Sequence, residues 1–143
     1  MVTQRVDRLL PYTAEQLFDL VADVESYPEY LPGWISARIR QRNSNEYHTD
    51  QVLGLGPFCL EFGSRTILQR PRRIDVTSTD FPFRQLKIAW TFEPQPGPAC
   101  KVTAFSEFEL HFSPLQRFYD RVLPNAIGDI MTAFEGRAAR LYT

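Results

Sequence analysis

The side chains best suited to catalysis or metal binding are few and scattered along the chain. The two histidines and two cysteines are His48, Cys59, Cys100 and His111. None of them forms a Cys-x-x-Cys or His-x-x-x-His pair, the spacings at which these residues share a metal ion. We therefore expect no metal site, and the two isolated thiols indicate a reducing compartment.

Two other patterns could in principle do chemistry. The segment Gly54-Leu55-Gly56-Pro57 is rich in glycine, but it lacks the lysine and the following helix of a phosphate-binding loop. Asp19 and Asp23 lie one helical turn apart, as paired carboxylates would. Exposed acids on a short helix usually form a solvated face, so we predict no catalytic residue from either pattern.

Length and composition limit the architecture. The chain has 143 residues, of which 43% are hydrophobic and 13% aromatic, so we expect a single domain over 1–143 with a sizeable core. A formal net charge of −1 gives no global attraction to nucleic acid, and we expect no DNA partner. No apolar run approaches the roughly 20 residues that span a bilayer.

A capped helix is predicted near the N-terminus. Thr13 followed by Gln16 forms a capping box, which places the helix start near Ala14. Apolar residues then recur at three- and four-residue spacing as far as Val24. Pro28 is expected to end the helix in a compact aromatic turn.

The remaining chain predicts strands and one long helix. Apolar and polar residues alternate over 2–10, 34–42, 47–55, 58–69, 74–78, 85–92 and 101–112. Such alternation is typical of an antiparallel sheet with one wet face. From Pro114 the period changes to that of a helix of about 25 residues with a wide apolar stripe, which Pro124 should kink or split. The predicted fold class is α+β, a curved antiparallel sheet of about seven strands around a long C-terminal helix.

Several segments resemble one family over nearly the whole chain. They are 12–32, which runs from Tyr12-Thr13 to Tyr30-Leu31-Pro32, and then 62–65, 70–76, 81–86, 90–94 and 133–135. Together they resemble the coenzyme Q-binding, START-like proteins of the polyketide cyclase/dehydrase superfamily, which also contains ribosome-association toxins of the RatA type. The resemblance implies a helix-grip START-like fold that holds a hydrophobic lipid between sheet and helix.

One departure concerns the residue after Leu31-Pro32. The family often has an aromatic residue there, whereas Gly33 intervenes here before Trp34. Because strand side chains alternate faces, this one-residue offset predicts that Trp34 points away from the cavity.

The two apolar faces supply the candidate ligand-binding residues. They are Phe58, Phe62, Ser64, Trp90, Phe108 and Phe112 from the sheet, and Ile127, Ile130, Met131 and Phe134 from the helix. This lining suits an apolar ligand with a few polar anchors. The resemblance implies ubiquinone or a related isoprenoid quinone, bound by a chaperone or carrier in respiration or quinone biosynthesis that requires no cofactor. It also implies peripheral contact with a membrane, at the cytoplasmic side of the inner membrane in a bacterium or the matrix face in a mitochondrion.

Two alternatives remain open. A RatA-like toxin would bind the large ribosomal subunit and block subunit association, and Arg70, Arg72 and Arg73 form a surface that suits either phosphates or anionic lipid headgroups. A polyketide cyclase-like enzyme would need an acid/base set, for which Asp50, Glu107 and His111 are candidates. The last two fall on the predicted wet face, so we expect no enzyme.

Overall fold

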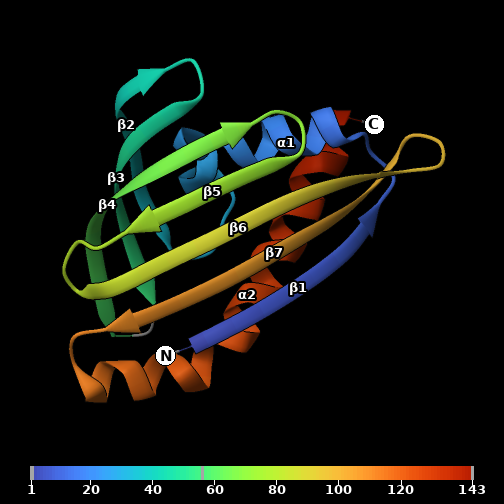
Figure 1. Ribbon diagram of the computed structural model, residues 1–143. Helices are drawn as coiled ribbons and strands as arrows, with labels where there is room; N and C mark the ends of the chain where they lie inside the picture. Colours follow the sequence, from blue (N-terminus) through green and yellow to red (C-terminus); the bar gives the residue numbers. More distant parts are fainter. Residues whose placement is uncertain (1, 56, 143) are drawn as a thin grey trace.

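The computed structural model describes residues 2–55 and 57–142 and has the predicted α+β architecture (Figure 1). The strands are β1 (Val2–Leu10), β2 (Trp34–Asn43), β3 (Glu46–Leu55), β4 (Phe58–Gln69), β5 (Arg73–Ser78), β6 (Phe83–Gln95) and β7 (Ala99–Leu110). They form one antiparallel sheet in the order β1-β7-β6-β5-β4-β3-β2. The helices are α1 (Ala14–Ala22), the 3-10 helix η1 (Val24–Glu29) and α2 (Ser113–Tyr142). The predicted curved sheet with a long C-terminal helix is therefore confirmed.

The capping box at the start of α1 forms as predicted. Thr13 Oγ1 accepts a hydrogen bond from the Gln16 amide at 3.1 Å, and the Thr13 amide donates to Gln16 Oε1 at 3.0 Å. The predicted end of the helix was wrong. The α-helix stops at Ala22, and Pro28 lies inside η1 together with Tyr27. Proline at this position removes one hydrogen bond of the 3-10 helix, because it has no amide hydrogen to donate.

The C-terminal helix is longer than predicted. It runs unbroken for 30 residues, which corresponds to about 45 Å. Figure 1 shows that α2 changes direction: its orange first part lies below the end of the sheet, and its red second part runs behind β6, β7 and β1. A bend within a continuous helix agrees with the predicted kink, because proline at position 124 has no amide hydrogen to donate.

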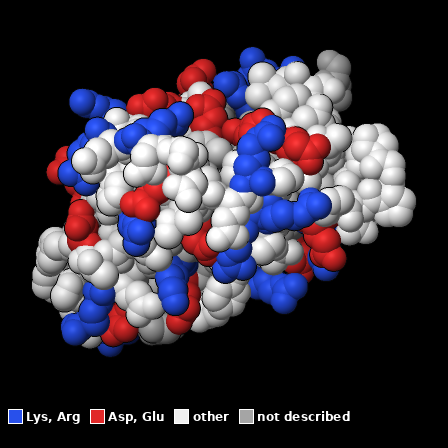
Figure 2. Space-filling model, turned by 45° about the horizontal axis from the view of Figure 1, so that its top comes forward, with Lys and Arg blue, Asp and Glu red and all other residues white. Residues whose placement is uncertain are grey.

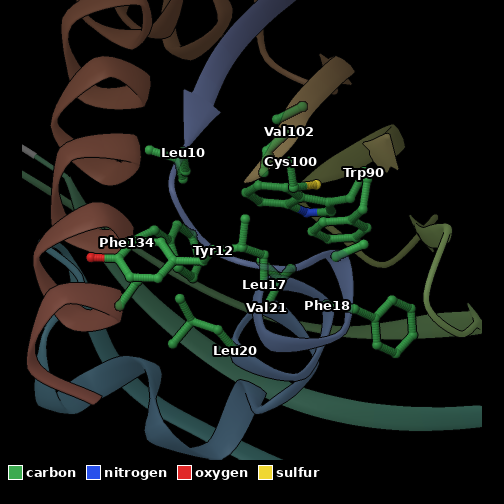
Figure 3. Close-up of a cluster of buried hydrophobic side chains, with 14 of the residues drawn as sticks. Leu10, Tyr12, Leu17, Phe18, Leu20, Val21, Trp90, Cys100, Val102 and Phe134 are labelled. Atoms are coloured by element: carbon green, nitrogen blue, oxygen red, sulfur yellow. The ribbon is translucent and has the colours of Figure 1, made fainter. Parts of the chain in front are cut away.

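The main core lies where α1, the sheet and α2 meet. Figure 3 shows side chains of α1, among them Leu17 and Val21, between Val102 of the sheet and Phe134 of α2. Phe92 and Ala138 are buried almost completely, at 1% and 0% exposure. This close packing fills one end of the space between sheet and helix.

Candidate ligand-binding cavity

The space between the sheet and α2 is filled by the core at one end only. A partly open cavity of about 230 Å³ lies between the concave face of the sheet and α2. Its exposed lining residues, Pro32 and Gly33, lie in the segment that leads into β2 and mark its mouth. The walls are almost entirely apolar, and side chains from α1, η1, six of the seven strands and α2 contribute to them.

Helix α2 forms one wall, and the four α2 residues that the sequence predicted are part of it. Ile127, Ile130, Met131 and Phe134 all line the cavity. The Phe134 ring also packs against three other aromatic rings, with centroid distances of 5.6 Å to Tyr27, 5.7 Å to Tyr30 and 5.3 Å to Trp90. Phe134 therefore joins the wall of the cavity to the packed core.

The sheet forms the opposite wall. Phe62, Trp90 and Phe108 line the cavity as predicted, and Phe83 lies between the first and last of them. The Phe83 ring centroid is 5.0 Å from that of Phe62 and 6.1 Å from that of Phe108, both with edge-to-face geometry. Edge-to-face pairs of this kind add about 0.5 to 1.5 kcal/mol each beyond the area that they bury, so they stabilise the aromatic wall.

Two predicted lining residues do not reach the cavity. Phe58 is 37% exposed and packs against Phe118 at the start of α2, with 5.0 Å between the ring centroids. Phe112 is 52% exposed and contacts Phe81 instead. Phe58 begins β4 and Phe112 follows the end of β7, so the alternation of the strand no longer sets the direction of either side chain.

Ser64 lies on the concave face but is not among the described residues that line the cavity. Its hydroxyl is 2.7 Å from Thr49 Oγ1 and accepts from Gln51 Nε2 at 3.2 Å. The polar residue that this cluster presents to the cavity is Gln51. Gln51 was not among the predicted site residues, although it alternates with Thr49 along the same strand.

Trp34 also faces the cavity, so the predicted orientation was wrong. The register between β2 and β3 advances by two residues on β2, from Trp34 to Ser36, while it advances by one on β3. This β-bulge rotates Trp34 onto the concave face and leaves Ile35 60% exposed. The indole Nε1 then donates to Gln51 Oε1 at 2.9 Å.

Two of the tyrosine hydroxyls at the cavity donate hydrogen bonds to backbone carbonyl oxygens, and a third has no partner among the described residues. The Tyr27 and Tyr47 hydroxyls donate to the Val21 and Ala22 carbonyl oxygens, at 2.9 Å in the second case. Burial raises the pKa of Tyr27 and raises that of Tyr47 to about 12, so both phenols stay protonated. The buried Tyr119 hydroxyl has no hydrogen-bond partner within the part of the chain that the structure describes.

The predicted arginine surface is largely neutralised. Arg70 forms a bidentate pair with Asp19, at 2.8 and 2.9 Å, and Arg73 pairs with Asp75 at 2.8 Å. Arg72 has no ion-pair partner among residues 2–55 and 57–142. On the face shown in Figure 2, Lys and Arg alternate with Asp and Glu and form no continuous basic patch.

The candidate acid/base residues are not brought together. Asp50 lies on β3, where it pairs with Arg40 at 3.1 Å, whereas Glu107 lies on β7, and β4, β5 and β6 separate the two strands. The His111 ring stacks on Phe81. Across the described residues, no three His, Cys, Asp or Glu side chains are placed to hold a metal ion, and no helix is long and apolar enough to cross a membrane.

Comparison with known proteins gives a consistent assignment. A family model described as polyketide cyclase/dehydrase and lipid transport matches residues 10–135. Ribosome association toxin RatA of Escherichia coli (strain K12) is 30% identical over 135 residues, which are 94% of this chain and 85% of the toxin. The mitochondrial coenzyme Q-binding protein COQ10 of Dictyostelium discoideum is 26% identical over 149 residues, covering 99% of this chain and 71% of that protein.

Solved structures share the fold. The Zhui aromatase/cyclase from Streptomyces sp. R1128 superposes with a TM-score of 0.85 at 13% identity, over 97% of this chain and 95% of that one. The 18 kDa protein CC1736 from Caulobacter crescentus superposes with a TM-score of 0.82 at 28% identity, over 99% of both chains.

Proposed function

This chain belongs to the polyketide cyclase/dehydrase and lipid transport family, and from that premise we propose that it binds an isoprenoid quinone such as ubiquinone. The quinone ring occupies the cavity between the sheet and α2. The protein serves as a chaperone or carrier for the lipid, contacts the membrane peripherally, and has no catalytic role of its own.

The observation that carries the proposal is an apolar void in an otherwise close-packed protein. Protein interiors contain few voids larger than a water molecule. At about 24 cal/mol per Å³, a fully closed void of about 230 Å³ would cost roughly 5 kcal/mol of packing, which is an upper bound for a cavity that is partly open. An unfilled space of that size lowers the stability of the protein, which favours a ligand that fills it.

The size of the cavity favours a ring as the buried part of the ligand. An engineered apolar cavity of about 150 Å³ in another protein binds benzene. A cavity of about 230 Å³ therefore suits one substituted six-membered ring. A long isoprenoid tail has to leave through the mouth beside Pro32 and Gly33.

Titration with a short-chain ubiquinone tests the proposal. Trp34 and Trp90 both line the cavity, so their fluorescence should be quenched saturably as the ring enters. Binding should also raise the free energy of unfolding, by about 2.7 kcal/mol at a hundredfold excess over Kd. Quenching that does not saturate, together with an unchanged thermal midpoint, would rule the proposal out.

Association with the large ribosomal subunit is the second candidate, and the similarity to RatA is the observation that favours it. The pairing of Arg70 and Arg73 with carboxylates weakens it, because a phosphate would have to displace both acids. Cosedimentation at physiological salt distinguishes the two functions, since only the ribosomal one requires the protein to travel with large subunits.

A further inference from the structure

Four side chains form a hydrogen-bonded cluster at one end of the cavity. Gln51 is at its centre: its Oε1 accepts from Trp34 Nε1 at 2.9 Å, and its Nε2 donates to Thr49 Oγ1 at 3.0 Å and to Ser64 Oγ at 3.2 Å. Thr49, Gln51 and Ser64 are 0%, 7% and 5% exposed. Of the four, Trp34 and Gln51 line the cavity.

The chemistry of Trp34 fixes the orientation of the Gln51 amide. An indole N–H can only donate, so the Gln51 atom that faces it must be the oxygen. The two hydrogens of Nε2 are then both used, one on Thr49 and one on Ser64. Thr49 and Ser64 are not among the described residues that line the cavity, so the group that the cluster presents to a ligand is the second lone pair of Gln51 Oε1, which is an acceptor.

The two tyrosines beside this cluster do not supply a donor to the ligand. The hydroxyls of Tyr27 and Tyr47 also line this region, but their hydrogens are committed to the carbonyl oxygens of Val21 and Ala22. A ligand carbonyl placed against Gln51 would therefore meet another acceptor, and both groups would be left without a hydrogen bond. A ligand hydroxyl would donate to Oε1 and satisfy it.

We infer that Gln51 recognises a hydroxyl group on the ligand, so that the cavity prefers a hydroquinone, or another phenol, to the corresponding quinone. The inference rests on the proposed function and names the redox form that the site selects. The hydroquinone gains a hydrogen bond to Gln51, whereas the quinone leaves a buried acceptor unpaired. The difference corresponds to a preference of about tenfold for the hydroquinone, or 1.4 kcal/mol.

Isothermal titration calorimetry under argon tests this with the tail-less ubiquinone ring, dimethoxy-methylbenzoquinone, and its hydroquinone. Wild-type protein should bind the hydroquinone about tenfold more tightly, and Gln51→Met, which removes the acceptor and leaves the Trp34 donor free, should lose that preference. Trp34→Phe removes the donor that fixes the Gln51 amide, so the amide can turn its Nε2 towards the ligand and the preference should weaken. Ser106→Ala is the matched control, because it removes a cavity-lining hydroxyl outside the cluster that can donate or accept equally well.

The midpoint potential of the bound ring is a second measurement. It would not depend on Gln51 if this residue only supported the structure. A tenfold preference for the reduced form raises the two-electron midpoint potential by about 30 mV, and Gln51→Met should abolish that rise. Equal affinities in the wild type, or a preference that survives in Gln51→Met, would overturn the inference while leaving quinone binding intact. Failure of both ring forms to bind would overturn the proposed function as well.

Discussion

Filling the cavity from one wall should stabilise the protein and block the ligand. Ala104 lies on β7, lines the cavity and is directly opposite Trp90 on β6. Ala104→Leu adds three carbon atoms that point into the void. Ala138 on α2 is the matched control, because it is also a buried alanine, at 0% exposure, but lies in the packed core and not among the cavity-lining residues described.

The two substitutions should shift stability in opposite directions. Burying a methylene-sized group contributes about 0.8 kcal/mol, so Ala104→Leu should raise the free energy of unfolding by about 2 kcal/mol. Ala138→Leu has no space for the same atoms and should lower it by about 1 to 3 kcal/mol. The added volume at position 104 should also weaken binding of the ubiquinone ring at least tenfold.

Urea unfolding followed by tryptophan fluorescence measures both effects, provided that the slope with denaturant is unchanged. If Ala104→Leu destabilises the protein as much as Ala138→Leu does, the core has no cavity at this position. If Ala104→Leu stabilises the protein but the ring binds as before, the ligand site lies elsewhere.

Three further predictions concern single polar side chains. Tyr119→Phe removes a buried hydroxyl without a partner, so it should leave stability unchanged or raise it by about 1 kcal/mol, and reduced ring affinity in thermal-shift titrations would show that the hydroxyl anchors the ligand. Arg70→Glu should lower the thermal midpoint by repelling Asp19, and the double variant with Asp19→Arg should restore it; no recovery would mean that the pair is not formed. Hydrogen bonds from Arg65 and His48 lower the pKa of Glu46 from 4.5 to about 2, so its stabilising contribution is present above pH 4.5 and is lost as the pH falls towards 2. Acid titration of Glu46→Gln, monitored by circular dichroism, should therefore lack this part of the pH dependence, and identical acid transitions would contradict it.

The sequence predicted the features that depend on local pattern. The capping box at Thr13, the alternation along the strands and the wide stripe of α2 each follow from the spacing of residues along one element. Those same patterns placed Ile127, Ile130, Met131 and Phe134 on one wall of the cavity and Phe62, Trp90 and Phe108 on the other.

What the sequence did not predict depends on contacts between elements. The bulge that turns Trp34 inward is defined only by pairing with β3, and the partners of Arg70 and Gln51 come from distant segments. Phe58 and Phe112 do not face the cavity as predicted, because one lies where a strand begins and the other where a strand has just ended. Hydrophobic alternation says nothing about side chains at such boundaries.

Native mass spectrometry of the protein, purified gently from the cells that make it, can detect the lipid itself. We expect a bound species whose mass and fragments identify an isoprenoid quinone, and its loss from Ala104→Leu. Protein that carries no lipid in either form, and that cosediments with large ribosomal subunits at physiological salt, would contradict quinone binding and support the ribosomal function instead.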